Sequence, residues 1–103
     1  MDEPFHPRIL VVDGQDATRP ALMRALSEAG FEPLEAVTAT AAFRLAEKEG
    51  PDLIVVDLEL PDGGGFELCR KIKNHRRLAD TPVVLVTPPP GGQRPKRRLR
   101  VGS

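Results

Sequence analysis

The stretch DLIVVDLELPDGGG, residues 52–65, decides how this chain folds. Its apolar run ends on a carboxylate at Asp57, and Pro61 and three consecutive glycines follow. A continuous run of Leu, Ile and Val is typical of a strand that is buried on both faces, as in a parallel sheet. Glycines allow other groups to approach the backbone closely. We therefore expect a buried strand that presents an acid at its C-terminal end, beside a glycine-rich loop.

Similar apolar runs lie on both sides of this stretch. Buried strands are predicted at residues 8–13 (RILVVD) and 81–87 (TPVVLVT), and a weaker strand at residues 31–36 (FEPLEA). Pro33 in the weaker strand suits the edge of a sheet, because proline has no N–H to donate. The segments between the strands carry apolar residues at helical spacing. About four strands alternating with three helices predict an α/β fold, a doubly wound parallel sheet covered on both faces.

Capping residues mark where the helices begin and end. Asp16 and Thr38 each precede a helical pattern, and the side-chain oxygen of each can accept a hydrogen bond from a free N–H of the first turn. Gly50 ends the second helix, and Pro51 prevents its continuation. Cys69, the only cysteine, lies on an apolar helix face. We therefore expect a buried structural thiol and no internal disulfide.

Charge is unevenly distributed along the 103 residues, although Lys and Arg number 15 and Asp and Glu also number 15. Five of the cations lie within residues 94–103, which contain no acid, so the rest of the chain is net acidic. No apolar run approaches the roughly 18–20 residues of a membrane span, and no signal peptide is recognisable. We therefore expect a cytoplasmic protein with no membrane partner.

A parallel sheet brings the ends of its strands together, and three polar residues stand at those ends: Asp13, Asp57 and Thr87. Two neighbouring carboxylates repel each other unless a cation lies between them, and Mg²⁺ prefers such oxygen ligands. A carboxylate can also attack phosphorus, and a nearby hydroxyl can then hold the transferred phosphoryl group. The alternative is that the acids at the strand ends only cap the helices that follow.

These motifs resemble the response-regulator receiver domain of two-component signalling. The similarity covers about residues 8–87: ILVVD resembles its first strand, DLIVVDLELPDGGGFELCRKIK its phosphoacceptor strand, loop and helix, and TPVVLVT its fourth strand. The resemblance implies a flavodoxin-like fold. It also implies that Asp57 accepts a phosphoryl group from a histidine kinase or a phosphotransfer protein, and that Thr87 hydrogen-bonds that group. Asp13, Asp57 and the main-chain carbonyl of Glu59 would bind Mg²⁺, and the protein would be a phosphorelay switch, not an enzyme.

Two departures from the family pattern bear on function. Gly14 stands where the family usually has a second acid that binds the metal directly, so the resemblance implies weak Mg²⁺ binding, which the Glu59 side chain would partly compensate. The family's lysine after the fourth strand also has no counterpart. A pseudo-receiver that docks partners without phosphorylation is therefore the alternative function. A phosphatase of the haloacid-dehalogenase type is disfavoured, because its D-x-D acid pair is missing.

The chain divides into an N-terminal extension (residues 1–7), an incomplete receiver-like domain (residues 8–87) and a tail (residues 88–103). The tail holds four prolines and three glycines, which predict disorder. The fourth strand would then be an open edge available for self-association. The basic tail suits nucleic-acid phosphates, but the chain has no Trp or Tyr to stack on bases, so nucleic acid is not an expected partner.

Overall fold

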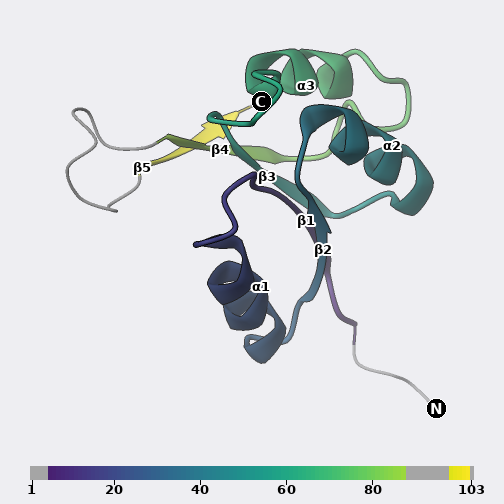
Figure 1. Ribbon diagram of the computed structural model, residues 1–103. Helices are drawn as coiled ribbons and strands as arrows, with labels where there is room; N and C mark the ends of the chain where they lie inside the picture. Colours follow the sequence, from purple (N-terminus) through teal and green to yellow (C-terminus); the bar gives the residue numbers. More distant parts are fainter. Residues whose placement is uncertain (1–4, 88–97, 103) are drawn as a thin grey trace.

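A computed structural model describes residues 5–87 and 98–102, with Thr87 and residues 98–102 described by their backbone. Strands and helices alternate along the chain up to the fourth strand, and a fifth strand follows (Figure 1). The elements in order are β1 (Arg8–Val12), α1 (Arg19–Glu28), β2 (Glu32–Ala36), α2 (Ala39–Glu49), β3 (Leu53–Asp57), α3 (Gly65–Lys73), β4 (Val83–Thr87) and β5 (Arg98–Gly102).

The strands form one sheet in the order β2-β1-β3-β4-β5. β1, β2, β3 and β4 are parallel, with Leu10 opposite both Leu34 and Ile54, and Ile54 opposite Val83. This order is the doubly wound, flavodoxin-like arrangement, in which the strand order reverses beside β1. The predicted fold class is therefore confirmed, and the weak strand that contains Pro33 lies at the edge of the sheet, as its proline indicated.

The helices lie on both faces of the sheet. α2 and α3 pack side by side on one face, and α1 lies on the other (Figure 1). The main core lies under α2 and α3, where alternate strand residues point inward because strand side chains have a period of two. Its fully buried members include Leu10, Val12, Ile54, Val56 and Val83.

Two of the three predicted helix boundaries are correct. The Thr38 side chain accepts a hydrogen bond from the Ala41 N–H at 3.1 Å, and Gly50 ends α2 in a left-handed conformation with φ of 58°. The prediction that Asp16 caps the first helix is wrong, because the N-cap of α1 is Thr18. Asp16 instead forms an exposed ion pair with Arg19, with 2.7 Å between Oδ1 and Nη2.

The C-terminal segment differs from expectation. Residues Arg98–Gly102 form β5, which pairs antiparallel with β4. The predictions that the fourth strand is an open edge, and that self-association would use it, are therefore wrong, since β5 covers that edge. An antiparallel edge strand needs only backbone donors and acceptors, and RLRVG contains no proline and alternates polar with apolar residues. The rest of the predicted disordered tail, residues 88–97 and 103, lies outside the described part of the chain.

In the described part of the chain, no helix has the length and apolar character that a membrane span requires.

Candidate functional site

The two predicted acids lie at the ends of neighbouring central strands. Asp57 is the last residue of β3, and Asp13 directly follows β1, whose Val12 is paired with Val56 of β3. Both acids are almost completely buried, with exposed fractions of 2% for Asp13 and 3% for Asp57. Carboxylates are rarely buried to this extent in a protein unless other groups interact with them. The sheet therefore forms the acidic strand-end pair that the sequence predicted.

The surroundings of Asp13 show that it also organises the loop into α1. Its Oδ1 accepts a hydrogen bond from the Gln15 N–H at 2.8 Å, and its Oδ2 accepts one from the Thr18 hydroxyl at 3.0 Å. The backbone carbonyl of Asp13 accepts a third from Nη1 of Arg19 at 3.0 Å. Asp13 therefore orders the loop before α1 and does not cap the helix, because neither of the donors to its carboxylate is a backbone N–H of the first helical turn.

Arg19 is a residue of this region that the sequence interpretation missed. Its guanidinium links the Asp13 carbonyl to the Glu35 carboxylate, with 3.2 Å between Nε and Oε2, and to Asp16. The hydrogen bond with Asp16, together with the nearby carboxylates, raises the pKa of Arg19 above its ordinary value. No sequence motif marks this contact, because Arg19 lies in α1 and Glu35 in β2.

Asp57 is held by the loop that follows it. Its Oδ1 accepts a hydrogen bond from the Glu59 N–H at 2.9 Å, which orients the carboxylate toward the turn. The Glu59 side chain is exposed. Within residues 5–87 and 98–102, no three acidic, histidine or cysteine side chains are grouped so that they could hold a metal ion. The idea that the Glu59 carboxylate replaces the acid missing at position 14 is therefore not supported by its placement.

Gly14 packs directly against Pro61. A Cβ at position 14 would lie 2.4 Å from Cδ and 2.8 Å from Cγ of Pro61, and 3.2 Å from the backbone oxygen of Val37. Real Cβ atoms essentially never approach other atoms so closely, and a proline ring cannot swing aside as a long side chain can. The ring of Pro61 thus occupies the space that a side chain at position 14 would need.

The glycines after Pro61 have separate roles. Gly63 adopts φ of 66°, a left-handed conformation that favours glycine. Gly65 begins α3 against the strand end, where an added Cβ would lie 3.1 Å from Leu58 Cα and 3.5 Å from Asp57 O. Glycine at this position therefore lets α3 start beside the acid, as the glycine-rich loop indicated.

Thr87, the third predicted site residue, is the last residue of β4. The strand register pairs Asp57 with Val86, so the backbone of Thr87 lies one residue beyond the partner of Asp57. The backbone placement agrees with the predicted strand end, while the role of the Thr87 hydroxyl stays a prediction.

A family model for the response regulator receiver domain matches residues 9–99, most of the chain. The chain belongs to the response regulator receiver family. The match extends past β4 into β5, so the receiver domain does not stop at residue 87 as the similarity of the motifs had suggested.

Relatives of this receiver domain are transcriptional regulators. It is 37% identical over 81 residues to the dual master transcriptional regulator RpaA of Synechocystis, covering 79% of this chain and 34% of RpaA. It is 35% identical over 80 residues to the phosphate regulon regulator PhoB of Escherichia coli, covering 78% of this chain and 35% of PhoB. The chain thus spans about a third of the length of the curated relatives it matches.

Solved receiver structures share the fold. The HemR receiver domain of Leptospira biflexa is 33% identical with a TM-score of 0.73, and the alignment covers 82% of this chain and 67% of that one. The chemotaxis response regulator CheY4 of Vibrio cholerae is 26% identical with a TM-score of 0.75, over 79% of this chain and 68% of that one. These similarities place the receiver domain in two-component signalling.

Receiver domains typically bind Mg²⁺ at the phosphorylation site. The residues present in this receiver domain fit that ion in part. Asp13 and Asp57 supply two hard carboxylate donors at adjacent strand ends, which is the ligand type that Mg²⁺ prefers. Gly14 supplies no side-chain donor, and Pro61 fills the space beside it.

Proposed function

We propose that this chain is the receiver module of a phosphorelay and that Asp57 accepts the phosphoryl group. The observation that carries the proposal is the buried Asp57 at the end of β3, beside Asp13, in a chain that belongs to the receiver family. Receiver domains interact with histidine kinases or phosphotransfer proteins, and one solved relative is the signal receiver domain of a histidine kinase. A phosphohistidine protein is therefore the proposed donor.

The chemistry requires one bond to form and one to break. A carboxylate oxygen of Asp57 attacks phosphorus, the phosphorus–nitrogen bond of the donor breaks, and the leaving imidazole takes up a proton from water. The product is an acyl phosphate on Asp57. A bound Mg²⁺ ion, held by Asp13, Asp57 and the carbonyl of Glu59, would offset the negative charge of the carboxylates and the phosphoryl oxygens. We assign the hydrogen bond to the phosphoryl group to Thr87, on the similarity of TPVVLVT to the family's fourth strand.

Access to Asp57 requires a local movement. The acid is only 3% exposed, and an in-line attack needs the phosphorus close to the carboxylate oxygen. We assign this movement to the loop after β3, whose Glu59 N–H binds the carboxylate and whose Pro61 packs on Gly14. The module would thus act as a switch that is modified once per signal, without turnover of a substrate. We place it in the cytoplasm, with the transcriptional regulators that it resembles.

The second candidate function is a pseudo-receiver that binds partners without phosphorylation. The contact between Gly14 and Pro61 favours it, because the proline ring fills the space where the family usually has a metal-binding side chain. Weak Mg²⁺ binding would follow from the same contact, since two carboxylates attract a divalent ion less strongly than three.

Intact-mass spectrometry after incubation with acetyl phosphate separates the two functions. The phosphoacceptor proposal expects the mass of one phosphoryl group to be added in the presence of Mg²⁺, and Asp57→Asn to abolish the gain. Asp80→Asn, which changes an exposed acid in the same way, should leave the gain unchanged. An unmodified wild-type chain, both with acetyl phosphate and with a phosphorylated histidine phosphotransfer domain, would refute the proposal in favour of the pseudo-receiver.

A further inference from the structure

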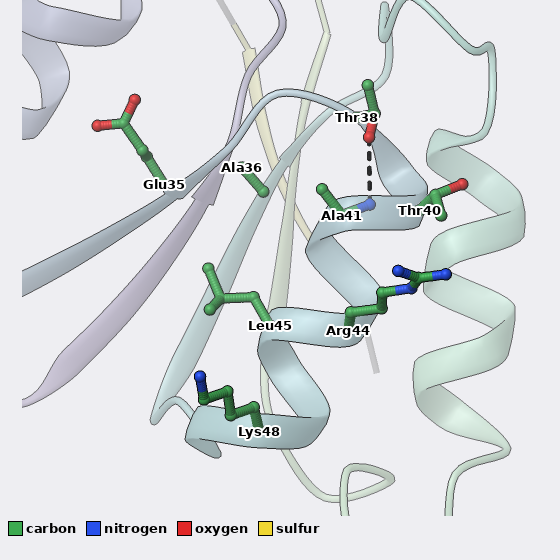
Figure 2. A pocket seen from close by; sticks show the side chains of 8 residues that line it. All are labelled: Glu35, Ala36, Thr38, Thr40, Ala41, Arg44, Leu45 and Lys48. Carbon is green, nitrogen blue, oxygen red and sulfur yellow. Dashed lines mark hydrogen bonds between the residues drawn. The ribbon is translucent and has the colours of Figure 1, made fainter.

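A groove away from Asp57 lies between α2 and the edge strand β2. It has a volume of about 490 Å³ and is lined by Glu35, Ala36, Thr38, Thr40, Ala41, Arg44, Leu45 and Lys48. Figure 2 shows these side chains, with two from β2 and most of the rest from α2. The groove is shallow and largely open to solvent, so it suits a ligand that lies along the surface.

Two cations on α2 give the groove its charge. Arg44 and Lys48 are exposed and lie four residues apart, so they occupy the same helix face, where like charges repel. In the part of the chain that the structure describes, neither side chain forms a hydrogen bond or an ion pair.

The nearby acids are bound to other elements and do not neutralise these cations. Glu35, the only acid in the lining, pairs with Arg19 at 3.2 Å. Its carboxylate lies away from Arg44 and Lys48 in Figure 2. Of the two acids on α2, Glu47 contacts Nε2 of His75 at 3.2 Å, and Glu49 pairs with Arg8. Among the described residues, the groove therefore carries two cations that no acid pairs with.

The floor of the groove is apolar. Ala36 of β2 is buried, Leu45 of α2 is partly buried against the core, and Ala41 lies at the N-terminal end of the groove. The Thr38 hydroxyl accepts the hydrogen bond from the Ala41 N–H (dashed in Figure 2) and can still donate its own proton, as can the exposed Thr40 hydroxyl. These two hydroxyls are neutral, so apolar contact with the floor and charge at the rim set the class of ligand.

We propose that this groove binds an acidic peptide segment of a partner protein. In this segment an apolar residue is followed by two acids, at the second and fourth positions after it. The Cβ atoms of Arg44 and Lys48 are roughly 6 Å apart on one helix face. Alternate residues of an extended peptide are about 6.5 Å apart on one side of the chain, so the spacing of two acids in a Glu-x-Glu pattern is similar to that of the Arg44 and Lys48 Cβ atoms. The charged ends of the two side chains point to different sides of α2 in Figure 2, so at least one of these exposed side chains turns when the peptide binds. The apolar side chain, two residues before, then lies on the floor near Ala41. This site does not depend on phosphorylation of Asp57.

An extended segment fits better than a single small anion, because the apolar floor contributes only to a ligand with apolar area to bury. A small anion would use the two cations alone. Addition of the peptide to the sheet edge itself is disfavoured, because Pro33, the second residue of β2, lacks a donor.

The test is titration of the isotope-labelled chain with the acetylated peptide Leu-Ser-Glu-Ser-Glu, followed by NMR. Amide shifts should concentrate at Ala36, Ala41 and Leu45. The charge reversal Arg44→Glu with Lys48→Glu should weaken binding at least tenfold. The matched control reverses two exposed cations after α3, Arg76→Glu with Arg77→Glu, and should leave the affinity within twofold. Circular dichroism checks that both double variants fold.

Three results would overturn the proposal. The first is the absence of shifts at the groove residues up to millimolar peptide. The second is evidence that the groove cations do not recognise the acids. It would be equal affinity for a peptide in which glutamine replaces both glutamates, or an equal loss of affinity in the groove double variant and in the control double variant. The third is binding to phosphatidylserine vesicles without binding of the peptide, which would make the basic face of α2 a membrane-binding surface.

Discussion

The contact between Gly14 and Pro61 makes a quantitative prediction about restoring the missing acid. Gly14→Asp should destabilise the chain although it supplies a carboxylate to the metal site. An added Cβ would lie 2.4 Å and 2.8 Å from Cδ and Cγ of Pro61, so the ring or the backbone has to move. Overpacking of this kind costs typically about 1–3 kcal/mol. We expect a loss in this range in the absence of Mg²⁺.

Pro61→Ala removes both of the ring atoms that clash. The aspartate should therefore cost less in the alanine background, and a double-mutant cycle should show a coupling of about 1–2 kcal/mol, within the usual range for residues in contact. The effect of Pro61→Ala on the unfolded chain cancels in the cycle. Gly14→Ala is the matched control: it adds the Cβ without the charge and should show a similar coupling.

The assay is urea unfolding followed by circular dichroism, with and without millimolar MgCl₂. The Gly14→Asp, Pro61→Ala double variant should gain more stability from Mg²⁺ than the wild-type chain does. A tenfold gain in affinity adds about 1.4 kcal/mol when the site is close to saturation. Additivity of the two substitutions within about 0.5 kcal/mol would refute the steric reasoning. A Mg²⁺ effect that is equal in all variants would show that position 14 does not reach the ion.

Further predictions concern the cap, the core, the thiol and the last strand. Thr38→Ala should lose about 1 kcal/mol of unfolding free energy with its cap hydrogen bond, and Thr40→Ala, which removes no cap, should change it by less than about 0.5 kcal/mol in urea titrations. Ile72→Ala should cost about 2–5 kcal/mol in the same assay, because this side chain is fully buried in the core. Burial raises the pKa of the Cys69 thiol, and nearby Lys73 partly offsets this rise, so alkylation of the thiol at mildly alkaline pH should be slower in the folded chain than in urea. The contribution of this shift to the free energy of unfolding is present below the pKa of the unfolded chain, and it should be lost as pH rises through the pKa of the folded chain. Deletion of residues 98–103 should speed hydrogen exchange in β4, and unchanged exchange would show that the pairing with β5 contributes nothing.

Much of the fold and half of the site could be predicted from local pattern. The apolar runs that include Ile54 and Val83 indicate doubly covered strands, and the segments between them show helical spacing, so the sheet and its helices follow from periodicity. Asp13 and Asp57 come together because parallel strands end at one edge, and that needs only the order of the elements. The cap at Thr38 also follows, since a capping hydrogen bond spans a few residues.

The tertiary structure alone decided the features that depend on residues far apart in the chain. Arg19 at the start of α1 contacts Glu35 of β2 as well as Asp16, so Asp16 forms an ion pair and Thr18 takes the N-cap position. The packing of Pro61 on Gly14 joins two loops that no spacing rule connects.

The sequence by itself thus determined the order of the elements, the family and the two buried acids. The structure decided that a short segment after the glycine- and proline-rich stretch adds an antiparallel strand beside β4, and that β2 and α2 enclose a basic groove. The physical reason is the range of the interactions. Periodicity and capping act over a few residues, and they also place Arg44 and Lys48 on one face of α2. The edge pairing of β5, the packing of Pro61 on Gly14 and the floor that β2 provides beneath α2 exist only once the chain has brought distant segments together.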